Sequence, residues 1–390
     1  MTINVFIHTL ENSMLKVTAG NSVALSQSVL NEYPERAFLL AKKNDFIILE
    51  HSPDKNYLNY LIENGIGTRN ILIPSAKGDF LSEKVLNDNT LLNFLRSLNS
   101  VVLHPYMSTP AESQIAKLIN ARVNGSSPEF TEKVNNKLFL VKFIEKIGGE
   151  LPEYEIANAI NVIEIAKKFQ NKYGKIIISG EHTYAGLAVW PIKNKKDFED
   201  FKTKIQACET QFLIEKLYEV LYSPNVQYQI NDKTIKFLGM TDQILDDNLE
   251  HHGNSYPSLA NQADKIRKYA NHIANELKLQ GYRGLLGIDF IETTQGKIFP
   301  VDINGRVNAS TFGLNINRKK PFITLTHIKI IKKITFIELK EILGENIFNS
   351  QTGTGILPYN IGFLKKGHFS AIIIGNTQKE CKEYLACLNK

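Results

Sequence analysis

The sequence has few cysteines, no long apolar run and no basic block, and each absence argues against a class of protein. Its 390 residues include only Cys208, Cys381 and Cys387. Their odd number and lack of metal-binding spacing favour inert thiols in a reducing cytoplasm. No apolar run approaches the ~18 residues that cross a bilayer, and the first residues lack the basic region of a signal peptide. We therefore expect a cytoplasmic protein without a membrane partner.

The charged residues do not indicate a nucleic-acid partner either. The 46 basic and 40 acidic residues give a net charge of +6, which is spread along the chain. The sequence shows no internal repeat and no low-complexity tract. With 43% hydrophobic and 22% charged residues, a chain of this length is typical of two or three globular domains with sizeable cores.

The first part of the chain predicts a small α/β layer domain. Short apolar runs, separated by helix-like segments, lie at residues 4–8, 37–40, 46–50, 71–74 and 100–104. A helix is expected from Pro110, because Thr109 and Glu112 form a capping box there. The Gly/Ser/Pro cluster at residues 124–128 then marks a domain boundary.

The remaining chain predicts a mixture of helices and strands. The expected helices cover residues 137–148, 159–173, 195–208, 263–279 and 336–343. The expected strands cover residues 175–178, 212–217, 226–230, 235–242, 356–360 and 369–374. We expect a loop over residues 246–258, because this long polar stretch has no regular periodicity. Loops of this length inside a domain are often functional.

The most informative stretch runs from residue 287 to residue 306. Two apolar runs flank a turn at Gln295-Gly296, which predicts an antiparallel hairpin with a two-residue turn. In that register Asp289 faces Asp302. Asn304 lies on the same face, because side chains alternate with a period of two along a strand.

Facing carboxylates repel each other, and a divalent cation removes this cost. Asp289, Asp302 and Asn304 offer the oxygen ligands that suit Mg²⁺, which proteins often hold together with substrate phosphates. Arg306 follows where the strand leaves the sheet. A calcium-binding loop is excluded, because Arg306 occupies the position of the next oxygen ligand. The alternative is an exposed hairpin with solvated carboxylates and Arg306 in a surface ion pair.

In combination, these features resemble the ATP-grasp superfamily, and within it the carboxylate-amine ligases, in particular the peptide ligases of pheganomycin biosynthesis. The motifs that carry the likeness are the 287–306 hairpin, Phe212-Leu213-Ile214-Glu215-Lys216, His104-Pro105-Tyr106, Asn135-Asn136-Lys137 and the stretches 241–245, 252–258 and 355–360. The resemblance implies an α/β (α+β) fold with four parts. These are an N-terminal Rossmann-like pre-ATP-grasp domain (1–128), two ATP-clamping subdomains (129–210 and 211–320, the latter with the metal site) and a small C-terminal α+β extension (321–390).

The resemblance also implies ATP and Mg²⁺ as cofactors, with Mn²⁺ as an alternative ion. It makes Asp289, Asp302 and Asn304 the metal ligands. Arg306 becomes the catalytic group that holds phosphate or the substrate carboxylate, a role that suits its planar guanidinium. Lys137 matches the lysine that reaches the nucleotide phosphates, although a lysine early in an amphipathic helix is usually solvated.

The same resemblance places adenine beside Glu215, Lys216 and Leu217. The carboxylate or backbone carbonyl of Glu215 would accept from the exocyclic amine of adenine, and the backbone amide of Leu217 would donate to the ring. The alternative for Glu215 and Lys216 is an ordinary exposed strand pair.

The chain departs from the family pattern at residues 176–186. Ser179 occupies the place of the usual lysine, and only Gly180 and Gly186 remain of the glycine-rich flap that covers the phosphates. Glu181 would repel phosphate unless it pairs with a cation. His182 could replace the lysine as a weak donor, and its alternative is a surface histidine.

Two further groups of residues are candidates for binding the substrates. His252, Ser255 and Tyr256 lie in the expected polar loop. A zinc site there is disfavoured, because adjacent histidines on an extended chain point apart. Asn308 and Ser310 follow Arg306 closely enough to line the same pocket, and their alternative is loop capping.

We therefore expect an ATP-dependent ligase that joins a small-molecule carboxylate, from an amino acid or short peptide, to an amine. The carboxylate would attack the γ-phosphate, and the amine would take the resulting acyl phosphate, with release of ADP and phosphate. The alternative is a nucleotide-binding accessory protein without ligase turnover. The sequence does not identify the substrates or the oligomeric state, for which a homodimer is one option.

Overall fold

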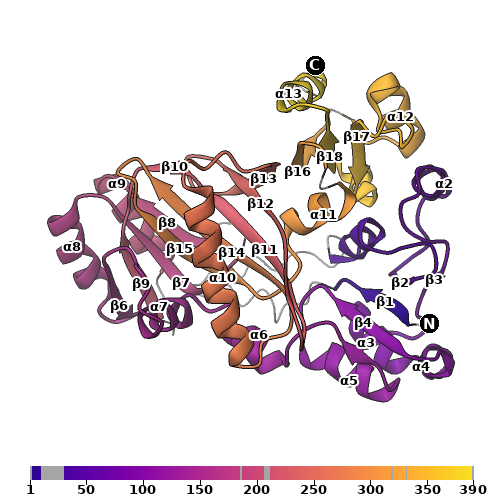
Figure 1. Ribbon diagram of the computed structural model, residues 1–390, viewed down its shortest axis with the longest axis horizontal. Coiled ribbons are helices and arrows are strands. Elements are labelled where there is room, and N and C mark those ends of the chain that lie inside the picture. The colour runs from indigo at the N-terminus through magenta and orange to yellow at the C-terminus, as the bar shows by residue number, and fades with distance from the viewer. Residues whose placement is uncertain are drawn as a thin grey trace.

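The computed structural model describes residues 2–9, 30–184, 187–205, 211–317, 319–330 and 332–388, which form three sheets and their covering helices (Figure 1). The predictions that concerned Gly186 and Cys208 lie outside these residues. Within the described ranges, no helix is both long and apolar enough to cross a membrane.

The first sheet is parallel and belongs to the N-terminal part of the chain. Its strands are ordered β3 (Ile71–Leu72), β2 (Phe46–Ile48), β1 (Ile3–Ile7), β4 (Val101–Pro105) and β5 (Arg122–Val123). Its helices are α2 (Lys55–Glu63), α3 (Leu81–Asn87), α4 (Asn89–Ser97) and α5 (Pro110–Leu118). The capping box of Thr109 and Glu112 begins α5 as expected. A parallel sheet with helical connections matches the predicted α/β layer domain.

The apolar run at residues 37–40 is not a strand of this sheet. Its first three residues belong to the 3₁₀ helix η1 (Tyr33–Leu39), which has Pro34 in its first turn and is buried from Pro34 to Leu39. A short run that is apolar throughout has no alternation, so periodicity alone does not distinguish a buried strand from a buried helical turn. The proline at the start of the helix was the available signal.

The second sheet is antiparallel and forms a separate lobe. Its strands are ordered β6 (Tyr154–Asn158), β9 (Gln211–Lys216), β7 (Ile176–Tyr184) and β8 (Leu187–Ile192). The helices α8 (Val162–Tyr173) and α9 (Lys195–Lys204) pack on this sheet. Helix α7 (Lys137–Lys146), which follows the short α6 (Pro128–Val134), contacts both this lobe and β15 of the third sheet.

The third and largest sheet joins the middle of the chain to its C-terminal part. Its path is β10 (Val220–Tyr222), β14 (Gly284–Thr293), β11 (Pro224–Ile230), β12 (Ile235–Leu245), β13 (His251–Tyr256), β16 (Phe322–Lys329), β18 (His368–Ile374) and β17 (Gly355–Tyr359), and β15 (Ile298–Asn304) pairs with β14. Helix α10 (Ala263–Leu279) packs against β11 and β14, while α11 (Ala309–Ile316) contacts β11, β12, β13 and β16. The strands after residue 320 thus extend this sheet. The same part of the chain also contains the helices α12 (Phe336–Leu343) and α13 (Gln378–Cys387).

The expected loop over residues 246–258 is also wrong in part. Its second half forms β13, which pairs with β12 and β16 inside the large sheet. The strand is polar on both faces, so it lacks the apolar alternation that identifies a half-buried strand from sequence. One of its faces contributes to the cavity described below, which accounts for its polar residues.

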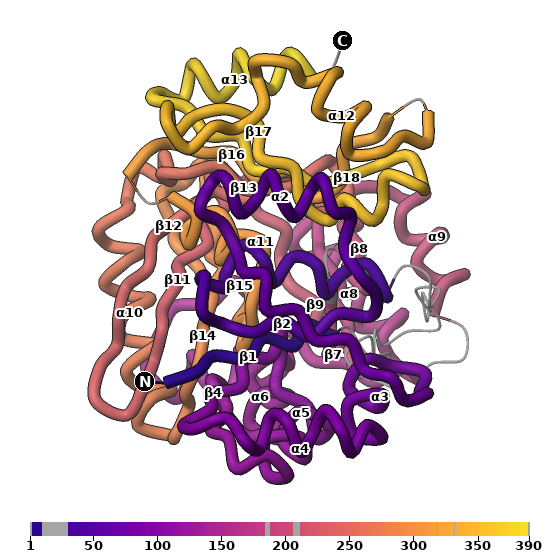
Figure 2. The backbone as a smooth tube through the Cα atoms, turned by 90° about the vertical axis from the view of Figure 1, so that its right-hand side faces the viewer, coloured from indigo at the N-terminus to yellow at the C-terminus, as the bar shows by residue number. Residues whose placement is uncertain are grey.

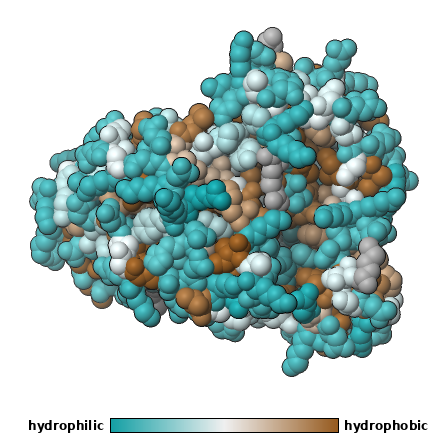
Figure 3. Space-filling view, in the orientation of Figure 1, coloured by the Kyte–Doolittle hydropathy of each residue, from teal (hydrophilic) through white to brown (hydrophobic). Residues whose placement is uncertain are grey.

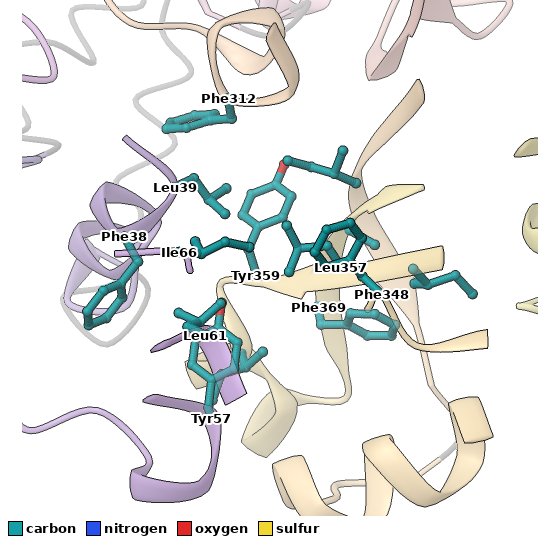
Figure 4. Packing of buried hydrophobic residues seen from close by; sticks show 14 of the residues in the cluster. Phe38, Leu39, Tyr57, Leu61, Ile66, Phe312, Phe348, Leu357, Tyr359 and Phe369 are labelled. Carbon is teal, nitrogen blue, oxygen red and sulfur yellow. The ribbon is translucent and has the colours of Figure 1, made fainter. Parts of the chain in front are cut away.

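The N-terminal and C-terminal parts of the chain share one hydrophobic core, and two views show them side by side (Figures 1 and 2). The hydroxyl groups of Tyr57 and Tyr60 on α2 donate to the backbone carbonyls of Pro358 and Phe348, each over 3.0 Å. Figure 4 shows Tyr359 of β17 beside residues from the N-terminal part. This shared core fixes η1 next to the end of β17.

Candidate active site

The hairpin of β14 and β15 pairs Asp289 with Asp302 as predicted, but by a different route. The turn is a three-residue loop, closed by a 2.9 Å bond from the Thr293 amide to the Lys297 carbonyl. Gly296 adopts a φ of +76° in it, a conformation that glycine accepts without strain. This loop alone would shift the register. A bulge at Val301 restores it, because Phe290 pairs with Pro300 while Asp289 pairs with Asp302.

The bulge also explains the position of Lys137. An extra residue in a strand leaves backbone groups outside the ladder, and the carbonyl of Val301 accepts a 2.9 Å hydrogen bond from Lys137 Nζ. The same Nζ lies 3.9 Å from Asp302 Oδ2. Lys137 is only 8% exposed, so it is not the solvated lysine of the sequence-based alternative.

Asp289 is buried among amide groups. The side-chain amides of Asn225 and Asn304 both donate to it, the second over 2.9 Å. Burial, followed by the charge of Asp302, raises the pKa of Asp289 to about 6. The protein thus holds two facing carboxylates at a cost that a bound cation would remove.

The amides below Asp289 form a short chain that the sequence analysis missed. Gln227 Nε2 donates to Asn225 Oδ1 over 2.5 Å and contacts Asn308 Oδ1 at 3.0 Å. Gln227 is fully buried and Asn225 nearly so. The available signal was the alternation of polar and apolar residues along Pro224–Ile230, a strand with apolar residues on its other face.

One cavity of about 760 Å³ connects the small sheet, the hairpin and the shared core. The space-filling view shows a largely hydrophilic face, with hydrophobic residues gathered toward its middle (Figure 3). The predicted site residues that line the cavity are Lys137, Ser179, Glu215, Lys216, Leu217, Asp289, Asp302, Asn304, Arg306, Asn308 and Ser310. Residues from five separate segments therefore meet at one place, as a composite active site requires.

Four predicted site residues are not part of the described lining. Alternation along β7 brings Ile177, Ser179 and Thr183 to the cavity and turns His182 the other way. Thr183 is a lining residue that the sequence analysis missed.

The other three lie on β13, where a bulge shifts the faces of the strand. His252 is exposed, and its Nε2 lies 3.4 Å from Asp246 Oδ2. Ser255 pairs with Ile323 within the sheet. Tyr256 stacks on Phe322, with the ring centroids 5.0 Å apart. His251 and Asn254 line the cavity in their place.

The strand expected to meet adenine offers other contacts than those predicted. The backbone amide of Leu217 donates to the Lys175 carbonyl over 3.0 Å, so that donor is already engaged. Burial raises the pKa of Glu215 to about 7, with Lys137 opposing this shift and Asp302 adding to it. Its side chain is thus buried near Lys137 and is not that of an exposed strand residue.

Glu181 does not leave an unsatisfied charge beside the expected phosphate site. Its carboxylate accepts hydrogen bonds from Asn136 Nδ2 over 3.0 Å and from the Gln211 amide over 3.1 Å. The repulsion predicted for this residue is therefore reduced by two donors.

Arg306, Asn308 and Ser310 also line the cavity, in the segment that follows Asn304. The guanidinium carbon of Arg306 is 6.0 Å from the ring centre of Tyr106. Asn308 is the N-cap of α11, and Ser310 Oγ bonds Thr241 Oγ1 over 2.8 Å. Asn308 therefore both caps the helix and lines the cavity.

The donor set fits a hard divalent cation. Asp289 and Asp302 face each other with Asn304 beside them, and carboxylate and amide oxygens are the ligands that Mg²⁺ prefers. Lys137 and Arg306 line the same cavity and would add positive charge to a site that holds nucleotide phosphates. The site can therefore neutralise a metal-bound triphosphate and an adjacent anion.

Comparisons with known proteins agree with this chemistry. Residues 152–304 match the family model for L-aspartate–L-methionine ligase of the ATP-grasp type, and residues 34–121 match the model for the pre-ATP-grasp domain. One curated relative, the [butirosin acyl-carrier protein]–L-glutamate ligase of Niallia circulans, is 23% identical over 310 residues, or 76% of this chain and 70% of that protein.

Solved structures show the same fold. An N5-carboxyaminoimidazole ribonucleotide synthetase in complex with ADP aligns over 100% of this chain and 96% of its own, with a TM-score of 0.61 and 14% identity. The N5-carboxyaminoimidazole synthetase of Staphylococcus aureus in complex with ADP has a TM-score of 0.60 and 12% identity. The alignment covers 100% of this chain and 98% of that chain. The Mg-ADP-bound biotin carboxylase domain from Hydrogenobacter thermophilus has a TM-score of 0.53 and 12% identity, and the alignment covers 85% of this chain and 75% of that chain.

Proposed function

We propose a reaction for this chain, which belongs to the ATP-grasp superfamily and is an ATP-dependent carboxylate-amine ligase. In the proposal, the carboxylate of an amino acid or short peptide attacks the γ-phosphate of ATP. An amine then displaces phosphate from the acyl phosphate to form a C–N bond, and the products are ADP, phosphate and the amide. The observation that carries the proposal is the facing pair Asp289 and Asp302, with Asn304 and Lys137, within one cavity.

Asp289, Asp302 and Asn304 would hold Mg²⁺, which supplies charge neutralisation to the phosphates when bound. Mn²⁺ prefers similar oxygen ligands and is the proposed alternative ion. Lys137 is fixed by the Val301 carbonyl, so its charge points to the phosphates without reorganisation during the reaction. Arg306, which lines the same cavity, would orient the carboxylate and the transferred phosphoryl group.

The nucleotide base would lie at the end of the cavity formed by Ile177, Lys216 and Leu217. This end is partly apolar, which suits a flat aromatic base. The missing lysine at Ser179 is expected to weaken binding of the phosphates, because a hydroxyl group replaces a charge. Lys137 then supplies the main protein charge on this side of the site.

The test is a product assay with ATP, Mg²⁺ and pairs drawn from the amino acids. The proposal expects ADP and phosphate in equal amounts, released only when both a carboxylate and an amine substrate are present. Release of AMP and pyrophosphate with an active pair would contradict the acyl-phosphate route. The Asp302→Asn protein serves as the inactive control in the same assay.

Ser179 also favours a second candidate, a nucleotide-binding accessory protein without turnover. The two candidates separate when ATP binding is measured beside ADP release. Tight ATP binding with no substrate-stimulated hydrolysis across the amino acid panel would support the accessory protein over the ligase.

A further inference from the structure

The cavity extends past Arg306 to an arginine that the proposed reaction does not use. Arg36, on η1, lines the cavity but is only 5% exposed. Its guanidinium carbon lies 3.8 Å from the ring centre of Tyr106 and 4.9 Å from that of Tyr33. Neither Nε nor Nη2 of Arg36 has a hydrogen-bond partner among the described residues.

Among the described residues, this guanidinium lacks the anion that its burial requires. Contact with aromatic rings attracts a cation, but less strongly than burial without acceptors destabilises it. The nearest acidic residue in the sequence, Glu35, accepts instead from the Gly362 amide over 3.2 Å. Within the described ranges, none of the salt bridges includes Arg36. An anionic ligand in the cavity would satisfy its N–H groups.

A second buried group beside this region lacks a donor. Asn360 directly follows β17, lines the same cavity and is 5% exposed. Its Nδ2 contacts Ser370 Oγ at 3.4 Å, whereas its Oδ1 is buried without a partner among the described residues. Glu35, the chain neighbour of Arg36, accepts from the amide of Gly362, two residues after Asn360, so the two unpartnered groups lie in one region.

The two groups together restrict the ligand. A simple anion would satisfy Arg36 and leave the Asn360 oxygen without a donor, and a simple amine would do the reverse. A molecule that carries both a carboxylate and an N–H donor satisfies both. Phe312 and Tyr359, whose ring centroids are 6.1 Å apart, add aromatic surface for its carbon atoms (Figure 4).

We propose that Arg36 and Asn360 form the subsite for the amine substrate, and that this substrate is an amino acid or peptide with a free carboxylate. Arg36 binds that carboxylate, and Asn360 Oδ1 accepts from an N–H of the same molecule. The carboxylate to be activated belongs instead near Arg306, which follows the metal ligand Asn304 by two residues. The assignment rests on the proposed ligase function and adds the class of its second substrate.

The experiment compares amino acids with the amines that lack their carboxylate: L-alanine with ethylamine, L-leucine with 3-methylbutylamine, and L-methionine with 3-(methylthio)propylamine. The wild-type protein should show a KM for the amino acid lower than that for its amine by about 10- to 100-fold, the scale of a charged hydrogen bond. Arg36→Met should abolish this preference while changing the KM for ATP less than about 2-fold. Arg69→Met, at an exposed arginine of the same domain, is the matched control and should keep the preference.

Three outcomes would overturn the subsite. The wild-type protein could use both members of a pair equally, Arg36→Met could raise only the KM of the activated carboxylate, or it could lower the Tm without changing any KM. If Arg36→Met does not fold, Arg36→Lys and the wild-type preference decide the question. Calorimetric binding of the same pairs, without turnover, separates this test from the ligase proposal. Amino acid binding that Arg36→Met abolishes would support the subsite even if no ligation is detected, and equal binding of both members would contradict it.

Discussion

We call the end of the cavity at Asp289, Asp302 and Lys137 the metal end, after its proposed role, and the end at Arg36 and Asn360 the substrate end. The two ends satisfy their charged groups in opposite ways. At the metal end, Asp289 accepts from two asparagine amides and Lys137 donates to the Val301 carbonyl. At the substrate end, Arg36 and Asn360 keep buried polar atoms without partners among the described residues. In the proposed reaction, the groups around the phosphates are thus organised in advance, whereas the other end would be completed by what binds there.

The difference has an energetic consequence. A buried polar group without a partner costs about 1–3 kcal/mol, and more when it is charged. Changes at the metal end should reduce catalysis more than stability, since each removes only one hydrogen bond or relieves a repulsion. Changes at the substrate end should alter stability and substrate binding together, because the free protein carries the cost.

The largest effect is expected from Asp302→Asn. Turnover should fall at least ~100-fold, because one charged ligand is lost where phosphate charge is concentrated. The metal-free protein should be as stable as the wild type or more so, because repulsion with Asp289 disappears. ADP release and thermal unfolding measure the two effects. The control is Asp264→Asn, at an exposed residue of α10. Near-normal turnover at limiting Mg²⁺ would contradict the metal site.

Lys137→Met is expected to have the next largest effect. The change removes the cation 3.9 Å from Asp302 and the donor to Val301, so kcat/KM for ATP should fall about 10- to 100-fold. The free energy of unfolding should fall by about 1 kcal/mol, the scale of one hydrogen bond. Lys142→Met on the exposed side of the same helix is the control. A loss of stability with unchanged kinetics would show that Lys137 has only a structural role.

The contrast between the two ends also separates what the sequence could predict from what it could not. The hairpin was predictable because register along paired strands is a local rule. The predicted turn was nevertheless wrong, and Asp289 faces Asp302 only because the bulge at Val301 offsets the longer loop. The polar run at residues 251–256 was a candidate, but His252, Ser255 and Tyr256 were chosen instead of His251 and Asn254, because a polar strand inside a sheet shows no apolar alternation that identifies its faces. The four domain limits and the homodimer stay predictions.

Arg36 could not be found from the sequence by the same reasoning. It lies in a buried 3₁₀ helix, and its place in the cavity depends on the core that η1 shares with β17. A contact between segments more than 300 residues apart has no local signal in one sequence. The fold class was accessible through motifs, whereas the substrate end required the three-dimensional arrangement.

Arg306→Lys tests the boundary between the two ends. It keeps the charge but removes the planar fork, so the reaction should lose about 1–3 kcal/mol in its transition state, as expected for a charged hydrogen bond. The Tm should change little. Steady-state kinetics with correction for the folded fraction gives the answer. A lower Tm with normal turnover per folded molecule would make Arg306 a structural residue and remove it from the site.

The smallest effect concerns stability beside the substrate end. Burial raises the pKa of Glu35 to about 7, with a smaller opposing contribution from its bond to the Gly362 amide. Between pH 4.5 and 7 the folded protein therefore keeps a proton on Glu35 that the unfolded chain releases, so the contribution of Glu35 to the free energy of unfolding falls as the pH rises through this window and is constant above it.

Glu35→Gln removes this loss, because an amide does not ionise and its oxygen can still accept from Gly362. The variant should match the wild type near pH 4.5 and exceed it at pH 8 by on the order of 2 kcal/mol. The raised pKa of His51, which its hydrogen bond to Glu32 causes, is present in both proteins and cancels to first order in the difference. Urea unfolding at the two pH values measures the effect, with the exposed Glu63→Gln as control. An advantage that does not change with pH would show that Glu35 is already ionised in the folded protein, and that this end tolerates a buried negative charge close to Arg36.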